Sequence, residues 1–398
     1  MNGRIPVAGF ELGINYWPRR SAMYMWRELD LAEVRDDMAH IASMGFSVVR
    51  LFTFTRDFLP RAMHVDPVML ARLVEVVRVA ADAGLRVVPT MIVINMSGRM
   101  WWPEWMSGGG AAPRDLFEDE ELLRSQALLV EQCASALAGS PAVRAFDLAN
   151  EIDEAQRPAS RHAGRAWATL LADAVRRAAP GVPVQIGAHL PSLTTRNNMR
   201  VDDLASVADE EMMHAYPLYS DAARSFLDPE LVPFSCALTS ALAGRGRRTL
   251  MQEFGLCTAP AGAEGRLITD DFLGEPRSQY LASEEEGADY YAAVLDRLAT
   301  TGAAGAYAWC YADYAPTLFE RAPFDTAVRE RTFGLVRADG SEKPAAAVFR
   351  EFAVRRGAAT HDAGGIAPAL DVDADTYYSA PAEHFARLYA AWLGRLTQ

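Results

Sequence analysis

Lysine is nearly absent from this sequence. Lys343 is the only lysine among 398 residues, and arginine supplies almost all of the positive charge. An enzyme that forms a Schiff base with its substrate needs a lysine amine at the end of a strand in its active site. Lys343 instead lies at the start of a helix predicted near 343–355. The sequence therefore argues against covalent chemistry based on lysine.

Cysteine, metal-binding spacings and phosphate-binding loops are also scarce. The seven histidines include no His-x-His pair, the pattern common in metal-dependent barrel hydrolases, and no G-x-G-x-x-G motif occurs. The cysteines are widely separated, match no zinc spacing and lack the histidine partner of a nucleophilic thiolate. We therefore expect no metal, no cofactor and four reduced thiols, at Cys133, Cys236, Cys257 and Cys310.

Segments for export or membrane anchoring are not visible either. Residues 1–13, MNGRIPVAGFELG, contain no apolar run long enough for a signal peptide, and no segment approaches the roughly 20 apolar residues of a membrane helix. The net charge of −13 argues against nucleic acid, because phosphate binding needs clustered Lys and Arg. We expect a cytoplasmic protein without a membrane or nucleic-acid partner; export by a removed leader is the alternative.

Short β-type runs alternate with longer helical patterns through the first 355 residues. Strands buried on both faces and separated by helices are typical of parallel βα units. Eight units predict an α/β fold, a (β/α)8 TIM barrel with long βα-loop insertions, whereas an open doubly wound sheet would carry a glycine-rich loop after its first strand. The strands are predicted at 11–17, 47–54, 86–93, 143–150, 182–189, 211–219, 248–256 and 304–312. The helices are predicted near 31–44, 68–84, 119–139, 160–179, 201–207, 230–243, 284–302 and 343–355.

The last forty or so residues depart from this alternation. We therefore divide the chain into a catalytic barrel at 1–355 and a C-terminal extension at 356–398. Residues 356–380 look irregular, and apolar residues then recur at helical spacing from Phe385 to Leu396. This pattern predicts a helix packed on the barrel, and a homo-oligomer contact is the alternative.

Acids, amides and aromatics concentrate at the carboxyl ends of the predicted strands, where the catalytic groups of a barrel lie. The fourth strand ends in Asn150 and Glu151, and the seventh ends in Glu253. These strands lie nearly opposite each other in an eight-stranded barrel, so both glutamates can face one cleft. Two carboxyl groups that flank a sugar bond are what glycoside hydrolysis requires, one as an acid and one as an ionised nucleophile.

Four motifs, in the right order, make the chain resemble the clan A glycoside hydrolases. They are LANE at the end of the fourth strand, HAYP on the sixth, MQEFG at the end of the seventh and AYAWCYAD on the eighth. The arginine in VVRLF, Arg50, fits the same pattern. The chain is most similar to the family 5 group of cellulases and mannanases, and the resemblance covers residues 11 to 355.

This resemblance implies a role for each matching residue. Glu151 would be the general acid and base, Glu253 the nucleophile, and Asn150 the partner of the sugar 2-hydroxyl. Charge and hydrogen bonds from its neighbours would keep Glu253 ionised. The substrate-binding residues would be Trp17, which ends the first strand, Arg50 and Tyr216 beside Glu253, His214 beside the acid pair, Trp309 under the sugar ring, Asn95 after the third strand, and the exposed-looking Trp101 and Trp102.

Several neighbouring residues keep more than one interpretation. His189 is either a structural histidine or a ligand contact. Asp147 is expected to pair with Arg144 or another neighbour, whereas Asp153 and Glu154 are expected in a solvated loop, unless one of them lines the site.

The resemblance implies a retaining β-glycosidase acting on an oligosaccharide or glycoside, and we favour an exo-acting β-mannosidase. The insertions at 95–118, 257–283 and 312–342 would wall off one end of the cleft. The enzymatic alternatives are a β-glucosidase and an endo-β-glucanase or mannanase. A barrel that only binds sugar is the non-enzymatic alternative, although it should have lost one of the two catalytic acids.

Overall fold

The eight predicted strands form the centre of the protein in a computed structural model, which describes residues 9–107, 114–272, 274–357, 368 and 370–396. Each strand is apolar because both of its faces are covered, one by helices and one by the barrel interior. All eight predicted positions are confirmed; the third strand has the predicted bounds, and the other seven are shorter. The strands are β1 (Glu11–Asn15), β2 (Val48–Phe54), β3 (Arg86–Val93), β6 (Phe146–Ala149), β7 (Val184–Gln185), β8 (Met212–His214), β9 (Leu250–Phe254) and β12 (Gly305–Ala308).

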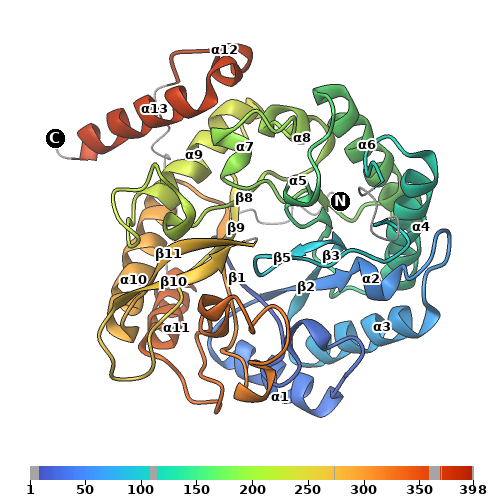
Figure 1. The fold of residues 1–398 in the computed structure, drawn as a ribbon, viewed down its shortest axis with the longest axis horizontal. Helices are drawn as coiled ribbons and strands as arrows, with labels where there is room; N and C mark the ends of the chain where they lie inside the picture. Colours follow the sequence, from blue (N-terminus) through green and yellow to red (C-terminus); the bar gives the residue numbers. More distant parts are fainter. Residues whose placement is uncertain (1–8, 108–113, 273, 358–367, 369, 397–398) are drawn as a thin grey trace, which may run out of the picture.

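The strands pair in parallel in the order β7-β6-β3-β2-β1-β12-β9-β8. An isolated parallel bridge between His189 and His214 links the two ends of this order. The protein is therefore a (β/α)8 barrel, as the sequence predicts, and the carboxyl ends of all eight strands meet at one mouth (Figure 1).

Helices fill the connections between the strands and cover the outside of the barrel (Figure 1). Several begin at an aspartate that caps them: Asp30, Asp66 and Asp119 each accept hydrogen bonds from the first backbone N–H groups of a helix. The longer helices are α1 (Leu31–Ser43), α3 (Pro67–Asp82), α4 (Glu120–Leu137), α6 (Arg161–Ala178), α8 (Val201–Val207), α9 (Leu231–Ala243), α10 (Glu284–Thr300) and α11 (Pro344–Gly357). Shorter helices are α2 (Thr55–Phe58), α5 (Ile152–Ala155), α7 (Pro191–Thr194) and the 3-10 turns η1 (Ala22–Tyr24), η3 (Pro217–Tyr219), η4 (Pro316–Leu318) and η5 (Val328–Arg331).

Two hairpins lie at the mouth of the barrel. They are not among the eight strands predicted from the sequence. The small hairpin of β4 (Asn95–Met96) and β5 (Arg99–Met100) follows the third barrel strand, and the larger hairpin of β10 (Arg266–Phe272) and β11 (Glu275–Leu281) follows the seventh. Figure 1 shows them reaching toward each other over the mouth. The two hairpins lie in the loop insertions expected at 95–118 and 257–283.

The C-terminal extension contains two helices, α12 (Ala374–Ser379) and α13 (Pro381–Leu396). The irregular conformation expected for 356–380 is wrong for α12, whose N-terminus is capped by Asp373. Part of that expectation, at 358–367 and 369, lies outside the described residues. Helix α13 contacts α7 and α9 on the outer ring (Figure 1).

The four cysteines are free and buried. None of the described helices is long and apolar enough to cross a membrane.

Candidate active site

Glu151 stands at the exit of β6 in an unusual backbone conformation. Its φ and ψ of 41° and 49° are left-handed, a region that non-glycine residues visit rarely and often at functional sites. The turn directs its carboxylate to His214, whose Nδ1 lies 2.9 Å from Oε1, and to Asn95, whose Nδ2 donates to Oε2 over 3.4 Å. Nε2 of His214 lies 2.9 Å from Oε1 of Gln252, which holds the ring in place.

Glu253 is the penultimate residue of β9 and is only 4% exposed. Its Oε1 accepts a hydrogen bond from Nη1 of Arg50, and its Oε2 accepts one of 2.8 Å from the Tyr216 hydroxyl. Burial and the charge of Glu253 raise the pKa of Tyr216 well above its usual value, so this hydroxyl stays a donor. Arg50 and Tyr216 thus hold the Glu253 carboxylate in one position.

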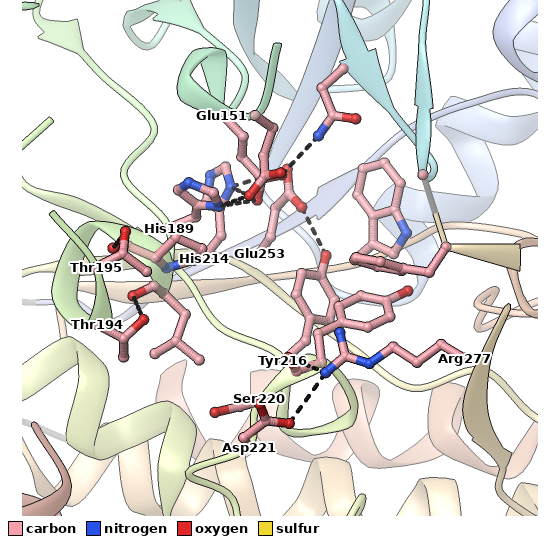
Figure 2. Close-up of a pocket in the computed structure, with 18 of the residues that line it drawn as sticks. Glu151, His189, Thr194, Thr195, His214, Tyr216, Ser220, Asp221, Glu253 and Arg277 are labelled. Carbon is pink, nitrogen blue, oxygen red and sulfur yellow. Dashed lines mark hydrogen bonds and ion pairs between the residues drawn. The ribbon is translucent and has the colours of Figure 1, made fainter. Parts of the chain in front are cut away.

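The two carboxylates face each other closely enough for one sugar bond to lie between them (Figure 2). One oxygen of each lies within 4.8 Å of the other. Carboxyl groups about 5 Å apart are typical of retaining glycosidases, because an inverting enzyme needs a wider gap for the attacking water.

Arg50 lies beneath this pair and is completely buried. Besides Glu253, its guanidinium binds Asp147 (2.8 Å), Thr90 (2.8 Å) and Oδ1 of Asn150 (3.0 Å). Arg50 therefore supports the site from below and does not line the cavity. Of the two alternatives expected for Asp147, Arg144 or another neighbour, the structure shows the second, with Arg50 as the partner.

Arg144 instead forms ion pairs with Glu11 and Glu210 at the other end of the strands. Asp147 points into the barrel, where the fully buried Arg50 is the nearest cation, and its second oxygen accepts a hydrogen bond from the backbone N–H of Gly187. An inward-pointing carboxylate in a barrel requires such a partner.

His189 is the centre of a second charged cluster next to Glu151. Its Nε2 lies 2.8 Å from Asp153, and its Nδ1 lies 3.8 Å from both Glu151 and Glu154. Burial alone would lower the pKa of His189, but the carboxylates of Asp153 and Glu151 raise it to about 10. Burial alone would raise the pKa of Glu151, yet the charge of His189 and the hydrogen bond to His214 outweigh it and lower that pKa.

The expectation of a solvated loop for Asp153 and Glu154 is wrong for Asp153, which is buried and also accepts a hydrogen bond of 2.6 Å from Asn197. Glu154 lines the cavity, and burial raises its pKa.

The remaining predicted site residues divide into two groups. Asn95, Asn150, His214, Tyr216 and Trp309 line the cavity with the two glutamates, whereas Trp17, Trp101 and Trp102 are not among its lining residues. Trp17 is fully buried and stacks on Phe52, with 5.3 Å between ring centroids. Trp101 is 4% exposed, so its exposed appearance in the sequence was misleading. Arg56 and Phe54 pack on the Trp101 ring, and Phe54 also packs on Trp17.

The cavity has a volume of about 610 Å³ and extends well beyond the catalytic pair. Figure 2 shows Thr194 and Thr195 on the His189 side of the two carboxylates, and Arg277 beyond Tyr216. Sequence reasoning missed most of these outer lining residues, because they lie in loops that match no motif. The missed residues include Thr194, Thr195, Tyr219, Arg277, Arg329, Glu330 and Phe385.

Among the described residues, one cluster of side chains could in principle hold a metal ion. One ligand atom each of Glu151, His214 and Glu253 lies within 4.8 Å of the others. The guanidinium of Arg50 already supplies a positive charge to Glu253, which disfavours a second cation at the same carboxylate.

The model of the cellulase family, glycosyl hydrolase family 5, matches residues 15–271. This span is more than half of the chain and includes both glutamates. The chain therefore belongs to glycosyl hydrolase family 5 and is a glycoside hydrolase. Among curated protein sequences, none matches this chain.

Solved structures with the same fold include family 5 enzymes. A GH5_18 protein from Streptomyces cattleya in complex with GlcNAc is 22% identical, with a TM-score of 0.82 and coverage of 98% of this chain and 91% of that one. A Glu-to-Ala variant of GH5_18 from the same organism is in complex with Manβ1-4GlcNAc. An exo-β-1,4-mannosidase from Opitutaceae bacterium strain TAV5 is 24% identical, with a TM-score of 0.75 and coverage of 96% and 67%. At these identities the likeness establishes the barrel fold alone.

Proposed function

We propose that this family 5 glycoside hydrolase is an exo-acting β-mannosidase. It would remove one β-linked mannose at a time from the non-reducing end of a short oligosaccharide, with retention of the anomeric configuration. The observation that carries the exo assignment is a bridge of protein across the barrel mouth, which we call the rim bridge. It consists of Gly98, Tyr219, Asp270, Arg329 and Glu330.

The rim bridge joins loops that follow the third, sixth, seventh and eighth barrel strands. Arg329 is fully buried; its Nη1 donates to Asp270 (2.9 Å) and its Nε donates to the hydroxyl of Tyr219 (3.1 Å). Tyr219 in turn donates to Glu330 over 3.2 Å. A Cβ placed on Gly98 would come within 2.6 Å of Arg329, so the tip of the β4–β5 hairpin rests directly on the guanidinium.

An endo-acting enzyme needs a groove that is open at both ends, so that a polymer can pass through the site. The third and seventh strands stand on opposite sides of the barrel, and the rim bridge connects their loops. A chain with further sugars on the glycone side would meet this bridge. The arrangement supports a site that accepts only a terminal sugar.

The proposed reaction is a double displacement. In the first step, an oxygen of Glu253 attacks the anomeric carbon while Glu151 donates its proton to the departing glycosidic oxygen. In the second step, Glu151 takes a proton from water, and this water displaces Glu253 from the anomeric carbon. Arg50 and Tyr216 hold Glu253 in place while it attacks in the first step and while it leaves in the second.

The choice of mannose rests on the similar structures and on an unused hydrogen-bond donor near the expected position of the sugar 2-hydroxyl. One of the similar proteins is described as an exo-β-1,4-mannosidase, and another is in complex with Manβ1-4GlcNAc. Asn150 donates one N–H to the backbone oxygen of Asn95 (3.1 Å), which leaves its second N–H for a sugar hydroxyl. We therefore propose Manβ1-4GlcNAc and β-1,4-mannooligosaccharides as substrates.

A panel of nitrophenyl β-glycosides tests the proposal, with β-mannan as a polymeric substrate. We expect the β-mannoside to be hydrolysed fastest, and nuclear magnetic resonance to find β-mannose as the first product. A higher kcat/KM on the β-glucoside would overturn the sugar assignment. Cleavage of mannan without cleavage of any nitrophenyl monosaccharide would overturn the exo assignment.

A further inference from the structure

Helix α13 of the C-terminal extension contributes part of the wall of the catalytic cavity. Ala382, Phe385 and Ala386 line the cavity from this helix. They lie outside residues 15–271, which the family model matches. Leu190 and Thr195 flank α7 and line the same region from the loop after β7. This part of the site is therefore built from an element that the family match does not include.

Hydrogen bonds fix the extension to the element that it faces. The hydroxyl of Tyr377 donates to the backbone oxygen of Leu193 (2.8 Å), and that of Tyr378 donates to the backbone oxygen of Ser192 (2.9 Å). Both acceptors belong to α7. The extension thus binds the backbone of α7 directly, which sets the distance between α7 and α13.

Aromatic packing then fixes α13 itself against α9. Phe234 of α9 contacts Phe385, Tyr389 and Trp392, with ring centroids 4.9 to 5.7 Å apart. The Tyr389 hydroxyl donates to Asp228 over 2.7 Å. Such interlocked aromatic contacts hold the cavity-facing side of the helix in one orientation.

We propose that α13 and the loop containing α7 form the subsite for the leaving sugar, the aglycone. This inference rests on the proposed function for the direction of the reaction. Glu151 protonates the departing oxygen, so the aglycone must leave on the Glu151 side of the pair. The cavity continues on that side past His189 to Thr194 and Thr195 (Figure 2) and on to α13, whereas the rim bridge crosses the mouth elsewhere.

The lining defines the chemical class of this aglycone. The α13 residues offer apolar contact, and the two threonine hydroxyls offer acceptors, because each donates its own hydrogen to a backbone oxygen: Thr194 to Leu190 (3.2 Å) and Thr195 to Pro191 (2.8 Å). Glu154 adds a carboxylate. A neutral sugar with hydroxyl or amide donors and an apolar face matches this lining, and an anionic sugar such as a uronic acid does not.

Bulky substitutions on α13 test the subsite. Ala382 and Ala386 are exposed and one turn apart, so Ala386→Trp and Ala382→Trp would fill the space above them. Ala390→Trp is the control: Ala390 is exposed on the next turn of α13 and is not a lining residue. Each variant is assayed on a β-1,4-linked disaccharide and on the matching β-glycosyl fluoride, whose leaving group is a single atom.

We expect Ala382→Trp and Ala386→Trp to lower kcat/KM for the disaccharide at least about tenfold, mainly through KM. For the glycosyl fluoride, kcat/KM should change less than about twofold. The control should change neither. Equal losses on both substrates, or no loss on the disaccharide, would overturn the subsite. If a tryptophan variant fails to fold and so loses both activities, Ala386→Leu decides by the same ratio.

The wild-type enzyme separates this inference from the proposed function. If it hydrolyses a β-glucosyl fluoride in preference to the β-mannosyl fluoride, the mannose assignment fails, and the same variants are then tested with the corresponding glucose disaccharide. The ratio of the two activities still reports on the aglycone subsite.

Discussion

Two regions of the site differ in how completely their polar groups are paired. In the floor, which consists of Arg50, Thr90, Asp147, Asn150 and Glu253, Arg50 donates to all four of the others and also to Asn15, so each nitrogen of its guanidinium has a partner. The rim bridge also centres on a buried arginine, but Nη2 of Arg329 has no hydrogen-bond partner among the described residues.

This difference indicates different tasks. A buried arginine whose donors are all paired holds its partners in one geometry, whereas a buried donor without a partner is costly. The floor is therefore ready for the chemical step before substrate arrives. In the rim bridge the unpaired donor is covered by Gly98, and the bridge shapes the mouth without touching the two glutamates, so we expect its substitutions to affect binding more than chemistry.

The largest effect is expected at the nucleophile in the floor. Glu253→Ala removes the attacking oxygen, so kcat should fall by roughly 10⁵-fold or more while the substrate still binds. Azide in the reaction should restore turnover of a good substrate and form the α-glycosyl azide, because azide enters from the side that Glu253 vacated. Glu151→Ala should instead form the β-glycosyl azide. Reversed products would exchange the roles of the two glutamates.

A second test substitutes the two buried arginines identically. Arg50→Lys replaces a five-donor fork with a point charge that cannot reach Glu253 and Asn150 together, so kcat should fall on the order of 100-fold. Arg329→Lys should lower kcat/KM only about tenfold, chiefly through KM. Steady-state kinetics and thermal melting of both variants provide the measurement. An equal loss of kcat in both would remove the distinction between floor and rim bridge.

The positions of the main floor residues could be predicted from the sequence. Glu253, Asn150 and Arg50 stand in recognisable motifs on barrel strands, as does Glu151 beside the floor, and the spacing of strands and helices places the strand ends at one mouth without further information. Asp147 was expected to pair with Arg144 or another neighbour, and the sequence could not identify Arg50 as that neighbour, since residues that face each other across a barrel interior are far apart in the sequence.

The rim bridge could not be predicted because its contacts depend on how long loops fold back over the mouth. Arg329 and Asp270 are 59 positions apart in two different insertions, and no periodicity connects them. The exposure expected for Trp101, after the third strand, was wrong for a related reason. A loop rich in Gly and Pro suggested exposure, but Trp101 packs against Phe54, which covers it. Helix α13 was predicted from its apolar spacing, but its part in the cavity was not, because the exposed Ala382 and Ala386 carry no sequence signal.

His189 lies next to Glu151, and its effect should be seen in the pH profile. Its charge lowers the pKa of Glu151, so His189→Gln should raise that pKa. The alkaline limb of kcat/KM follows loss of the acid's proton, and it should therefore move to higher pH. A dinitrophenyl glycoside, whose leaving group needs little protonation, should lose less activity than the disaccharide.

The control for this prediction is His162→Gln, because His162 is exposed at the start of α6, outside the cavity lining. It should leave the profile unchanged. A His189→Gln profile that matches the wild type would mean that His189 has only a structural role.

The smallest effect is expected at the outer edge of the cavity, where Arg277 meets Asp221. Their ion pair is long, at 3.3 Å, and Asp221 is fully exposed, so water screens the attraction that Arg50 and Glu253 retain in the interior. Asp221→Asn should change kcat/KM less than about twofold, and the small change should vanish in high salt. A loss as large as that of Arg329→Lys would mean that Asp221 contacts the substrate itself, and the boundary of the binding region would then extend beyond the rim bridge to the exposed edge.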